Sequence, residues 1–418
     1  MRIELPNRDA LETVEIPRRN LIAVLRPVDP KPIHDVERET AEGCRAAREA
    51  CRSARRVLIL VNDYTRPTPN APILATLEPA LEDKDVRVLI CAGTHRAPTG
   101  EEMERVLGRD FLAWHRGSVR AHDAQDRARM FFAGKTRFGN EVRFNRDLLW
   151  PDLIIAVNSV EPHYFAGYTG GRKSFLPGVA AYETICHNHE MVTHDRSRPF
   201  GLEGNPVHED MEEAAKMLLR PVFSIQLVLG HDHRPCSVRF GGLEKSFAQA
   251  AQDCRVVYAL PIEEKADIIL SVLLPPYHVN FYQSQRAVEF CRAALARPAV
   301  HITVSACPDG VGNDGFIEVF RRCARPEDVL AMPSRPLSAN AGSAPRLGWH
   351  KSARLARILE HAELYTVVGV EDEVVRAAFM RPFRSIQAAL DAALERIGPA
   401  ARVYVIPDAG AVVPVLPD

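Results

Sequence analysis

Short runs of apolar, largely β-branched residues recur along the chain, separated by charged or amphipathic stretches. Because these runs are apolar at consecutive positions, they are typical of strands that are buried on both faces. They occupy residues 57–61, 88–90, 153–157, 224–229, 268–274, 300–304, 366–370 and 403–406. Helix-like stretches, with apolar positions every three or four residues, lie at 37–55, 243–254, 286–297, 351–362 and 383–397. This alternation predicts an α/β protein with mainly parallel sheets flanked by helices.

The length of the chain favours two domains. Its 418 residues exceed what one compact core usually holds. A charged stretch at 262–266 interrupts two strand patterns, so we expect the junction there. The predicted domains are residues 1–264 and 265–400, with the active site in the cleft between them. The terminal strand segment, 401–418, is compatible with either domain, including a return to the first.

Composition narrows the classes of function. The chain has 53 basic and 54 acidic residues, and its formal net charge of -1 argues against a nucleic-acid or anionic-membrane partner. No apolar run has the length of a signal peptide or a membrane span. The nine cysteines form no C-x-x-C pair, which favours free thiols. We therefore expect a cytoplasmic protein that acts on a small molecule; the sequence does not give its oligomeric state.

Polar side chains directly follow four of the predicted strands. In open α/β sheets, ligands bind at the carboxyl ends of the strands, so residues at these positions are favoured as functional. The four polar segments are residues 62–67, 93–96, 161–165 and 278–286. We expect them to line one crevice.

His95 and His163 lie in the second and third of these segments. Histidine titrates near neutral pH, so a pair facing one substrate suits proton removal and return from opposite sides. Inversion of a stereocentre needs such an acid and base. The alternative is that they are two unrelated loop histidines.

A glycine-rich loop follows the third strand and ends in two basic residues. Gly167, Gly170 and Gly171 allow backbone N–H groups to approach an anion, and Arg172 and Lys173 add positive charge. Phosphate is the natural ligand of such a loop. The loop does not match the P-loop pattern, because Arg172 stands where that pattern needs glycine. A plain turn is the alternative.

Further histidines cluster after this loop, at His187, His189 and His194. Imidazole suits nickel, copper, iron and zinc, so this cluster is compatible with a metal site. Any one of them, taken singly, is more often a surface or core residue. His231 and His233 lie in a turn and are interpreted as structural.

Four motifs then resemble one known family, the nickel-pincer lactate racemases and their homologues. The motifs are N-D-Y-T-R-P-T-P, G-T-H-R-A-P-T, E-P-H-Y-F-A-G-Y-T-G-G-R-K-S-F-L-P-G and the N-H pair at 188–189. They appear in the family's order, and the intervals from His163 to Lys173 and from Lys173 to His189 match its pattern. The resemblance extends over most of the chain.

The resemblance implies a nickel-pincer nucleotide, a pyridinium mononucleotide with two sulfur-containing arms, covalently bound to Lys173 as a thioamide. Nickel would lie in the pincer, with His189 as its protein ligand. Enzymes that synthesise the cofactor would be needed as partners for activation. The first domain would hold the cofactor, and the second would close over the substrate. The cofactor-binding residues, besides Lys173, would be Asp63, Thr65, Gly170, Gly171, Arg172 and Ser174.

The resemblance also implies a reaction: racemisation or epimerisation of a small 2-hydroxy acid. His95 and His163 would act as alternating base and acid on the hydroxyl proton, while the C2 hydrogen passes as hydride to the cofactor. Arg66 would bind the substrate carboxylate. Lactate is the default substrate, but malate, longer aliphatic or aromatic hydroxy acids and sugar acids stay open, because Arg286 stands where the family has lysine. The implied substrate-binding residues of the second domain are Tyr282, Gln283, Arg286 and Trp349.

Two other interpretations of the same residues remain open. In one, the protein is a hydrolase or lyase with zinc bound by His163, His187 and His189. In the other, it is a non-catalytic phosphate or nucleotide binder that uses only the glycine-rich loop.

Overall fold

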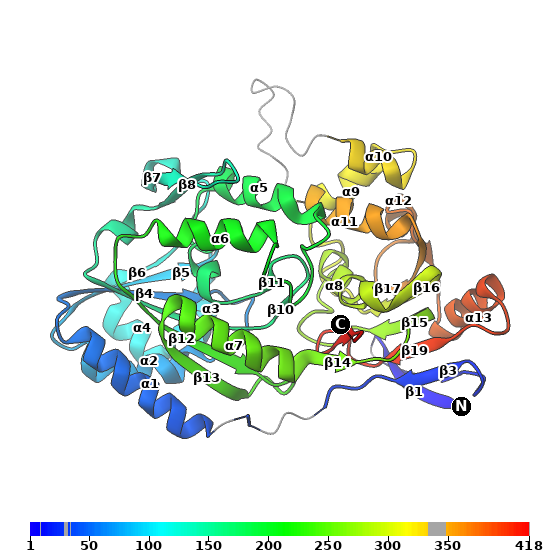
Figure 1. Cartoon of the computed structure of the whole chain (residues 1–418), viewed down its shortest axis with the longest axis horizontal. Helices are drawn as coiled ribbons and strands as arrows, with labels where there is room; N and C mark the ends of the chain where they lie inside the picture. The colour runs from blue at the N-terminus through cyan, green and yellow to red at the C-terminus, as the bar shows by residue number, and fades with distance from the viewer. Residues whose placement is uncertain (9, 29–31, 34, 333–347, 418) are drawn as a thin grey trace. The chain divides into compact units, whose positions relative to one another are not determined.

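The chain divides into two units, each built around its own six-stranded sheet (Figure 1). The computed structural model describes residues 1–8, 10–28, 32–33, 35–332 and 348–417. We call residues 29–257 the N-terminal unit. The C-terminal unit combines residues 1–28 with residues 258–418.

The sheet of the N-terminal unit is parallel except for one edge strand. Strand β13 runs antiparallel to β12, whereas all the other neighbouring pairs are parallel. The strands, in order across the sheet, are β13 (Pro235–Gly242), β12 (Val222–Leu229), β9 (Leu153–Ser159), β4 (Arg56–Asn62), β5 (Asp85–Cys91) and β6 (Val119–Ala121).

Both faces of this sheet are buried, as the consecutive apolar residues of its strands require. In β4, Val57, Ile59 and Val61 pack on one face, and Leu58 and Leu60 pack on the other. The first face is covered by α1 (Val36–Cys51), α2 (Asn70–Leu77), α3 (Gly100–Leu107) and α4 (Arg109–His115). The second is covered by the hairpin of β7 (Met130–Lys135) and β8 (Glu141–Asn145), and by α5 (Tyr182–Glu190) and α6 (Pro206–Lys216). Helix α7 (Leu243–Tyr258) follows β13.

The sheet of the C-terminal unit is parallel throughout. Its order is β18 (Arg381–Pro382), β17 (Ala362–Val368), β16 (Leu295–Ser305), β15 (Ala266–Val272), β19 (Val403–Ile406) and β3 (Leu21–Val24). One face packs against α8 (Phe281–Cys291), α9 (Asp314–Arg321), α11 (Trp349–Leu359) and α12 (Asp372–Ala377). The other packs against α13 (Ile386–Ile397) and the hairpin of β1 (Arg2–Asn7) and β2 (Ala10–Glu15). Smaller elements are α10 (Pro326–Ala331) and the pair β14 (Ala259–Pro261) and β20 (Val413–Val415).

All eight predicted apolar runs coincide with strands of the two sheets, which confirms the predicted α/β class. One helix is displaced from its predicted range of 286–297. Helix α8 begins at Phe281, because the Asn280 side chain accepts a hydrogen bond from the backbone N–H of Gln283 and caps it. Its predicted end is wrong, since β16 starts at Leu295.

The structure also corrects the expected domain limits. Residues 1–28 belong with the C-terminal unit, because β3 pairs with β19. The segment 401–418, expected to be able to return to the first domain, belongs to the C-terminal unit as well, since β19 lies between β15 and β3. The junction falls at 257–258, slightly before the predicted one at 264–265.

No helix in the described part of the chain is both long and apolar enough to cross a membrane. None of the nine cysteines forms a disulfide.

Candidate active site

Three loops of the N-terminal unit leave the sheet at the same edge. Strands β4, β5 and β9 are adjacent and parallel, with Val61 paired to both Ile90 and Val157 near their carboxyl ends. Asp63 follows β4, His95 follows β5 and His163 follows β9. The predicted placement of these residues after strands is therefore confirmed, and it follows from the strand order alone.

Asp63 and His95 form a close pair. The His95 Nδ1 lies 2.6 Å from Asp63 Oδ2, and the Thr65 hydroxyl donates to Asp63 Oδ1 at 2.6 Å. The Asp63 side chain is 4% exposed and that of His95 is 45% exposed. Burial raises the pKa of Asp63, but hydrogen bonds from His95 and Thr65 outweigh it, so the net pKa is lowered. The ionised carboxylate accepts a hydrogen bond from Nδ1–H, which leaves His95 Nε2 as the ring nitrogen free to contact a substrate.

This pairing gives Asp63 and Thr65 a contact that the sequence interpretation did not include, while their predicted contact with the cofactor stays a prediction. The sequence interpretation assigned both residues to the nucleotide cofactor. In the structure their side chains bond to each other and, through Asp63, to His95.

His163 lies in a two-stranded turn of β10 (Pro162–His163) and β11 (Gly167–Tyr168). The backbone N–H of Ala166 donates to its Nδ1 at 3.3 Å. A backbone amide can only donate, so Nδ1 is the acceptor and the neutral ring carries its proton on Nε2. The imidazole is buried against Tyr164, with ring centroids 4.9 Å apart, and against Phe165, at 4.4 Å. The two histidines thus have opposite tautomers.

The glycine-rich loop is packed tightly against the protein. Gly170 and Gly171 both have positive φ, and a Cβ on Gly171 would come within 2.6 Å of the Phe247 ring. The Gly171 N–H donates to Gln226 Oε1 at 3.0 Å. Because that N–H has a protein acceptor, the prediction that Gly171 binds a cofactor phosphate is not supported by its geometry.

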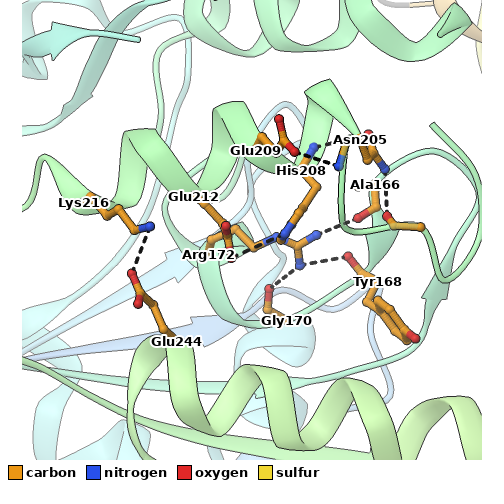
Figure 2. Close-up of polar contacts among 12 residues, drawn as sticks. Ala166, Tyr168, Gly170, Arg172, Asn205, His208, Glu209, Glu212, Lys216 and Glu244 are labelled. Atoms are coloured by element: carbon orange, nitrogen blue, oxygen red, sulfur yellow. Dashed lines mark hydrogen bonds and ion pairs between the residues drawn. The ribbon is translucent and has the colours of Figure 1, made fainter. Parts of the chain in front are cut away.

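Arg172 and Ser174 also point into the protein. The Arg172 side chain is buried, and its guanidinium donates to the carbonyl oxygens of Ala166, Tyr168 and Gly170 (Figure 2). The Ser174 hydroxyl donates to Asn158 Oδ1 at 2.8 Å. Both polar groups bind protein atoms, and their role as cofactor contacts stays a prediction.

Lys173, which lies between Arg172 and Ser174, differs from both in its polar contacts. Its side chain is half-buried, and within the described residues its ammonium has no hydrogen bond or ion pair. Burial lowers the pKa of Lys173 well below its ordinary value, and the charges of Arg66 and Arg172 lower it further against the opposing effect of Glu161. A neutral amine is the nucleophilic form of lysine.

His189 lies near Lys173 because both contact Phe165. The Phe165 ring lies 5.0 Å from the His189 ring, 4.4 Å from that of His163 and 5.7 Å from Lys173 Nζ. Burial and the Lys173 charge lower the pKa of His189 to about 3. The neighbouring Asn188 donates to the buried carboxylate of Asp210 at 2.8 Å, which fixes the end of α5. His189 is therefore a neutral, rigidly held imidazole, the form that binds a metal.

The histidine cluster expected for the zinc interpretation is not assembled. The His187 Nε2 lies 3.0 Å from the carbonyl oxygen of Phe138. In the parts of the chain that the structure describes, no three His, Cys, Asp or Glu side chains are placed to hold one metal ion. His163, His187 and His189 therefore do not converge as three protein ligands.

Arg66 is close enough to Lys173 for its charge to lower the lysine pKa. The guanidinium of Arg66 is half-buried and forms no hydrogen bond or ion pair with any described residue. It is a cation with open donors beside the reactive residues, as carboxylate binding requires.

The remaining predicted site residues lie in the C-terminal unit, on helices. Tyr282, Gln283 and Arg286 are in the first two turns of α8, and Trp349 is the first residue of α11. The Arg286 guanidinium stacks over the rings of Tyr277 and Phe290, 3.9 and 4.4 Å from their centroids. The indole N–H of Trp349 is buried and has no acceptor among the described residues.

Sequence reasoning missed Lys351, which joins the two helices. Its Nζ donates to the carbonyl oxygen of Tyr282 at 2.5 Å and lies 3.8 Å from that ring centroid. Burial lowers the pKa of Lys351 to about 7; the Arg286 charge acts in the same direction, and Glu289 opposes it. His350 lies beside it, with Nε2 3.4 Å from the Tyr282 hydroxyl. The W-H-K sequence at 349–351 was the available signal, but only its tryptophan was noted.

Comparison with known proteins gives a consistent result. Residues 8–200 match the model of the lactate racemase N-terminal domain, and residues 263–414 match that of the lactate racemase C-terminal domain. The chain is 29% identical over 382 residues to a lactate racemase from Thermoanaerobacterium thermosaccharolyticum, covering 90% of this chain and 88% of that protein. It is 29% identical over 392 residues to a lactate racemase from Lactiplantibacillus plantarum, covering 89% of each.

Solved structures agree with these matches. The lactate racemase apoprotein from Thermoanaerobacterium thermosaccharolyticum superposes with a TM-score of 0.88 at 26% identity, covering all of both chains. A protein from Thermotoga maritima superposes with a TM-score of 0.70 at 16% identity, covering 93% of this chain and all of that one, and supports the fold alone.

Proposed function

The chain belongs to the lactate racemase family, and from this premise we propose that it is an isomerase that interconverts the two configurations of a small 2-hydroxy acid, with lactate as the reference substrate. One observation carries the proposal. His95 and His163 lie at one sheet edge with opposite tautomers, fixed by Asp63 and by the Ala166 N–H. A racemase needs one group that takes the hydroxyl proton and one that returns a proton from the other side.

The residues around Phe165 fit the nickel-pincer nucleotide of this family. Lys173 has an amine with a lowered pKa and no hydrogen bond or ion pair among the described residues, as a covalent tether needs. His189 is a neutral imidazole against the same aromatic ring, as a nickel ligand needs. When bound, the cofactor would supply a reversible acceptor for the C2 hydride.

The proton chemistry falls to the two histidines. His95 Nε2, unprotonated, accepts the substrate hydroxyl proton as the 2-oxo acid forms. After the planar 2-oxo acid has turned, His163 Nε2 donates its proton to the carbonyl oxygen as C2 regains hydrogen from the opposite face. The reaction in reverse exchanges the roles. Asp63 stabilises the imidazolium that forms at His95, as a buried carboxylate does in hydrolase triads.

Substrate binding divides between the two units. Arg66 would hold the carboxylate through its open donors, and Gln283 and Arg286 would contact the other polar groups. The buried indole N–H of Trp349 would donate to an oxygen of the substrate. Arg286, sandwiched between two rings, is a broader and more rigid cation than lysine, so the preferred acid is expected to differ in size from lactate.

Activation requires the cofactor-synthesis enzymes as partners. A reducing compartment, the cytoplasm, is the proposed location, supported by the nine free cysteines.

Intact-mass analysis of chain produced with those enzymes tests the proposal. We expect an adduct and about one nickel per chain in the unaltered chain, and neither in Lys173→Ala. His95→Ala and His163→Ala should keep the adduct but lose racemisation of lactate or related acids. An active chain with unmodified Lys173 would refute the cofactor, and full activity in either histidine variant would refute the acid and base roles.

A further inference from the structure

Arg172, next to the proposed tether, is surrounded by backbone carbonyls. Its Nη2 donates to the Ala166 carbonyl oxygen at 2.6 Å, and its Nη1 donates to those of Tyr168 and Gly170 at 3.1 and 3.3 Å. Figure 2 shows the guanidinium enclosed by these carbonyls, with α6 alongside. We propose that Arg172 is a positioning residue that sets the shape of the loop carrying Lys173, rather than a ligand of the cofactor phosphate. This inference rests on the proposed tether at Lys173.

The geometry explains how Arg172 would act on its neighbour. The three carbonyls belong to residues 166–170, the segment that contains β11 and leads to Lys173. The helical turn at Gly171–Ser174 then begins, with the Lys173 N–H donating to the Gly170 carbonyl oxygen at 3.1 Å. Gly170 thus accepts from both Arg172 and Lys173. The Lys173 side chain lies on different partners from Arg172, with its Nζ 5.7 Å from the centroid of the Phe165 ring.

The surroundings stabilise a buried cation at this position. The Arg172 guanidinium lies 4.4 Å from the centroid of the Phe247 ring, and the carboxylate of Glu212 on α6 contributes a favourable charge. Glu212 is itself 3.4 Å from His208 Nε2. Burial lowers the pKa of Arg172 to about 9, so it stays charged at neutral pH. Carbonyl dipoles take the place of a phosphate at Nη1 and Nη2, whereas the buried Nε has no acceptor among the described residues.

An arginine is needed because one planar group must reach three acceptors. Lysine carries the same charge on a single nitrogen and cannot reproduce the fork. Loss of the fork would remove three hydrogen bonds to the 166–170 backbone, although the Ala166 and Gly170 carbonyls keep the backbone N–H groups of Tyr168 and Lys173 as donors. Arg172→Lys keeps the charge but removes the fork of donors. A residue that only binds phosphate would tolerate this change, whereas a residue that holds the 166–170 backbone would not.

The experiment compares Arg172→Lys and Arg172→Met with the unaltered chain. Lys216→Met is the matched control, since it removes a nearby cation whose ion pair with Glu244 is exposed (Figure 2). Amide hydrogen exchange of cofactor-free protein reports on residues 166–178, and intact mass after exposure to the synthesis enzymes reports on Lys173 loading. In the loaded fraction, kcat and KM for lactate are measured.

We expect both Arg172 variants to exchange at least about tenfold faster in 166–178, with β12 unchanged, and to load poorly. Their loaded fraction should show a reduced kcat, with KM within about twofold of the unaltered value, because the tether has moved and the carboxylate site has not. Lys216→Met should match the unaltered chain.

Wild-type exchange and loading in Arg172→Lys would overturn the proposal, because charge alone would then suffice. Should Arg172→Met fail to fold, Arg172→Gln retains an amide donor and should give intermediate exchange; unchanged exchange there would also overturn it. If even the unaltered chain acquires no adduct, the proposed cofactor fails, and the exchange data still decide the role of Arg172.

Discussion

The two six-stranded sheets present their candidate residues in different ways. In the N-terminal unit, Asp63, His95 and His163 sit in loops directly after parallel strands. In the C-terminal unit, Arg286 and Trp349 sit on helices. The chemistry differs as well: imidazoles, a carboxylate and a reactive lysine in one, cations and aromatic rings in the other. Under the proposed function, the N-terminal unit supplies the proton transfer, the tether and the carboxylate contact of Arg66, and the C-terminal unit supplies the other substrate contacts.

The sharpest test of this division is Asp63→Asn. Without the carboxylate, His95 loses the partner that fixes its tautomer, and kcat should fall by about 10²–10³-fold. The KM for lactate and the Lys173 adduct should change little. Steady-state racemisation, followed by chiral chromatography, measures the effect. Thr65→Val, which removes only the hydroxyl that supports Asp63, should lose less; an equal loss would show that the His95 pair is not the cause.

Breaking the ion pair inside the C-terminal unit should affect stability most. Glu289 and Arg354 are almost fully buried and form two hydrogen bonds of 2.6 Å, which join α8 to α11. Glu289→Gln leaves a buried arginine charge and should lower the free energy of unfolding by about 3 kcal/mol. Urea unfolding followed by far-ultraviolet circular dichroism measures it. The exposed pair of Arg321 and Glu318 is the control, where Glu318→Gln should change less than about 0.5 kcal/mol.

Acid should destabilise both units through buried histidines. Burial lowers the pKa of His301 to about 3, from an ordinary value of 6.5. Below pH 6.5 the His301 side chain is protonated in the unfolded chain, whereas in the folded chain it is protonated only near pH 3. The free energy of unfolding therefore falls as pH falls through this window. His301→Gln should reduce the loss of unfolding free energy between pH 7 and pH 5 by about 1–2 kcal/mol. Urea midpoints at the two pH values test this; an unchanged pH dependence would contradict it.

The smallest expected effect comes from Lys351→Met. Loss of the bond to the Tyr282 carbonyl should loosen the first turn of α8, and KM should rise about tenfold while kcat changes little. Lys351→Arg restores a donor and should recover part of the affinity. A fall in kcat with constant KM would place Lys351 in the chemistry and would break the proposed division between the units.

Much of this architecture could be predicted because strands buried on both faces leave uninterrupted apolar runs. The reactive residues of the N-terminal unit could be found by their position after such runs. Arg172 could not be interpreted correctly, since a basic residue beside glycines suggests phosphate, and its real partners are backbone carbonyls with no sequence signature. Lys351 was missed for a related reason: its acceptor is a carbonyl on another helix.

The edge of the C-terminal sheet was equally hard to predict. Strand β3 has only four residues, and its partner β19 lies far along the chain. No local pattern indicates a pairing across such a distance.

This pairing has a consequence for biosynthesis. During translation the Leu21–Val24 segment emerges early, yet the backbone groups that it bonds to, around Val403–Val405, are made near the end. The intervening N-terminal unit has all its own strands available and is free to fold on the ribosome first. The early segment therefore cannot complete its place in the sheet until β19 has been made.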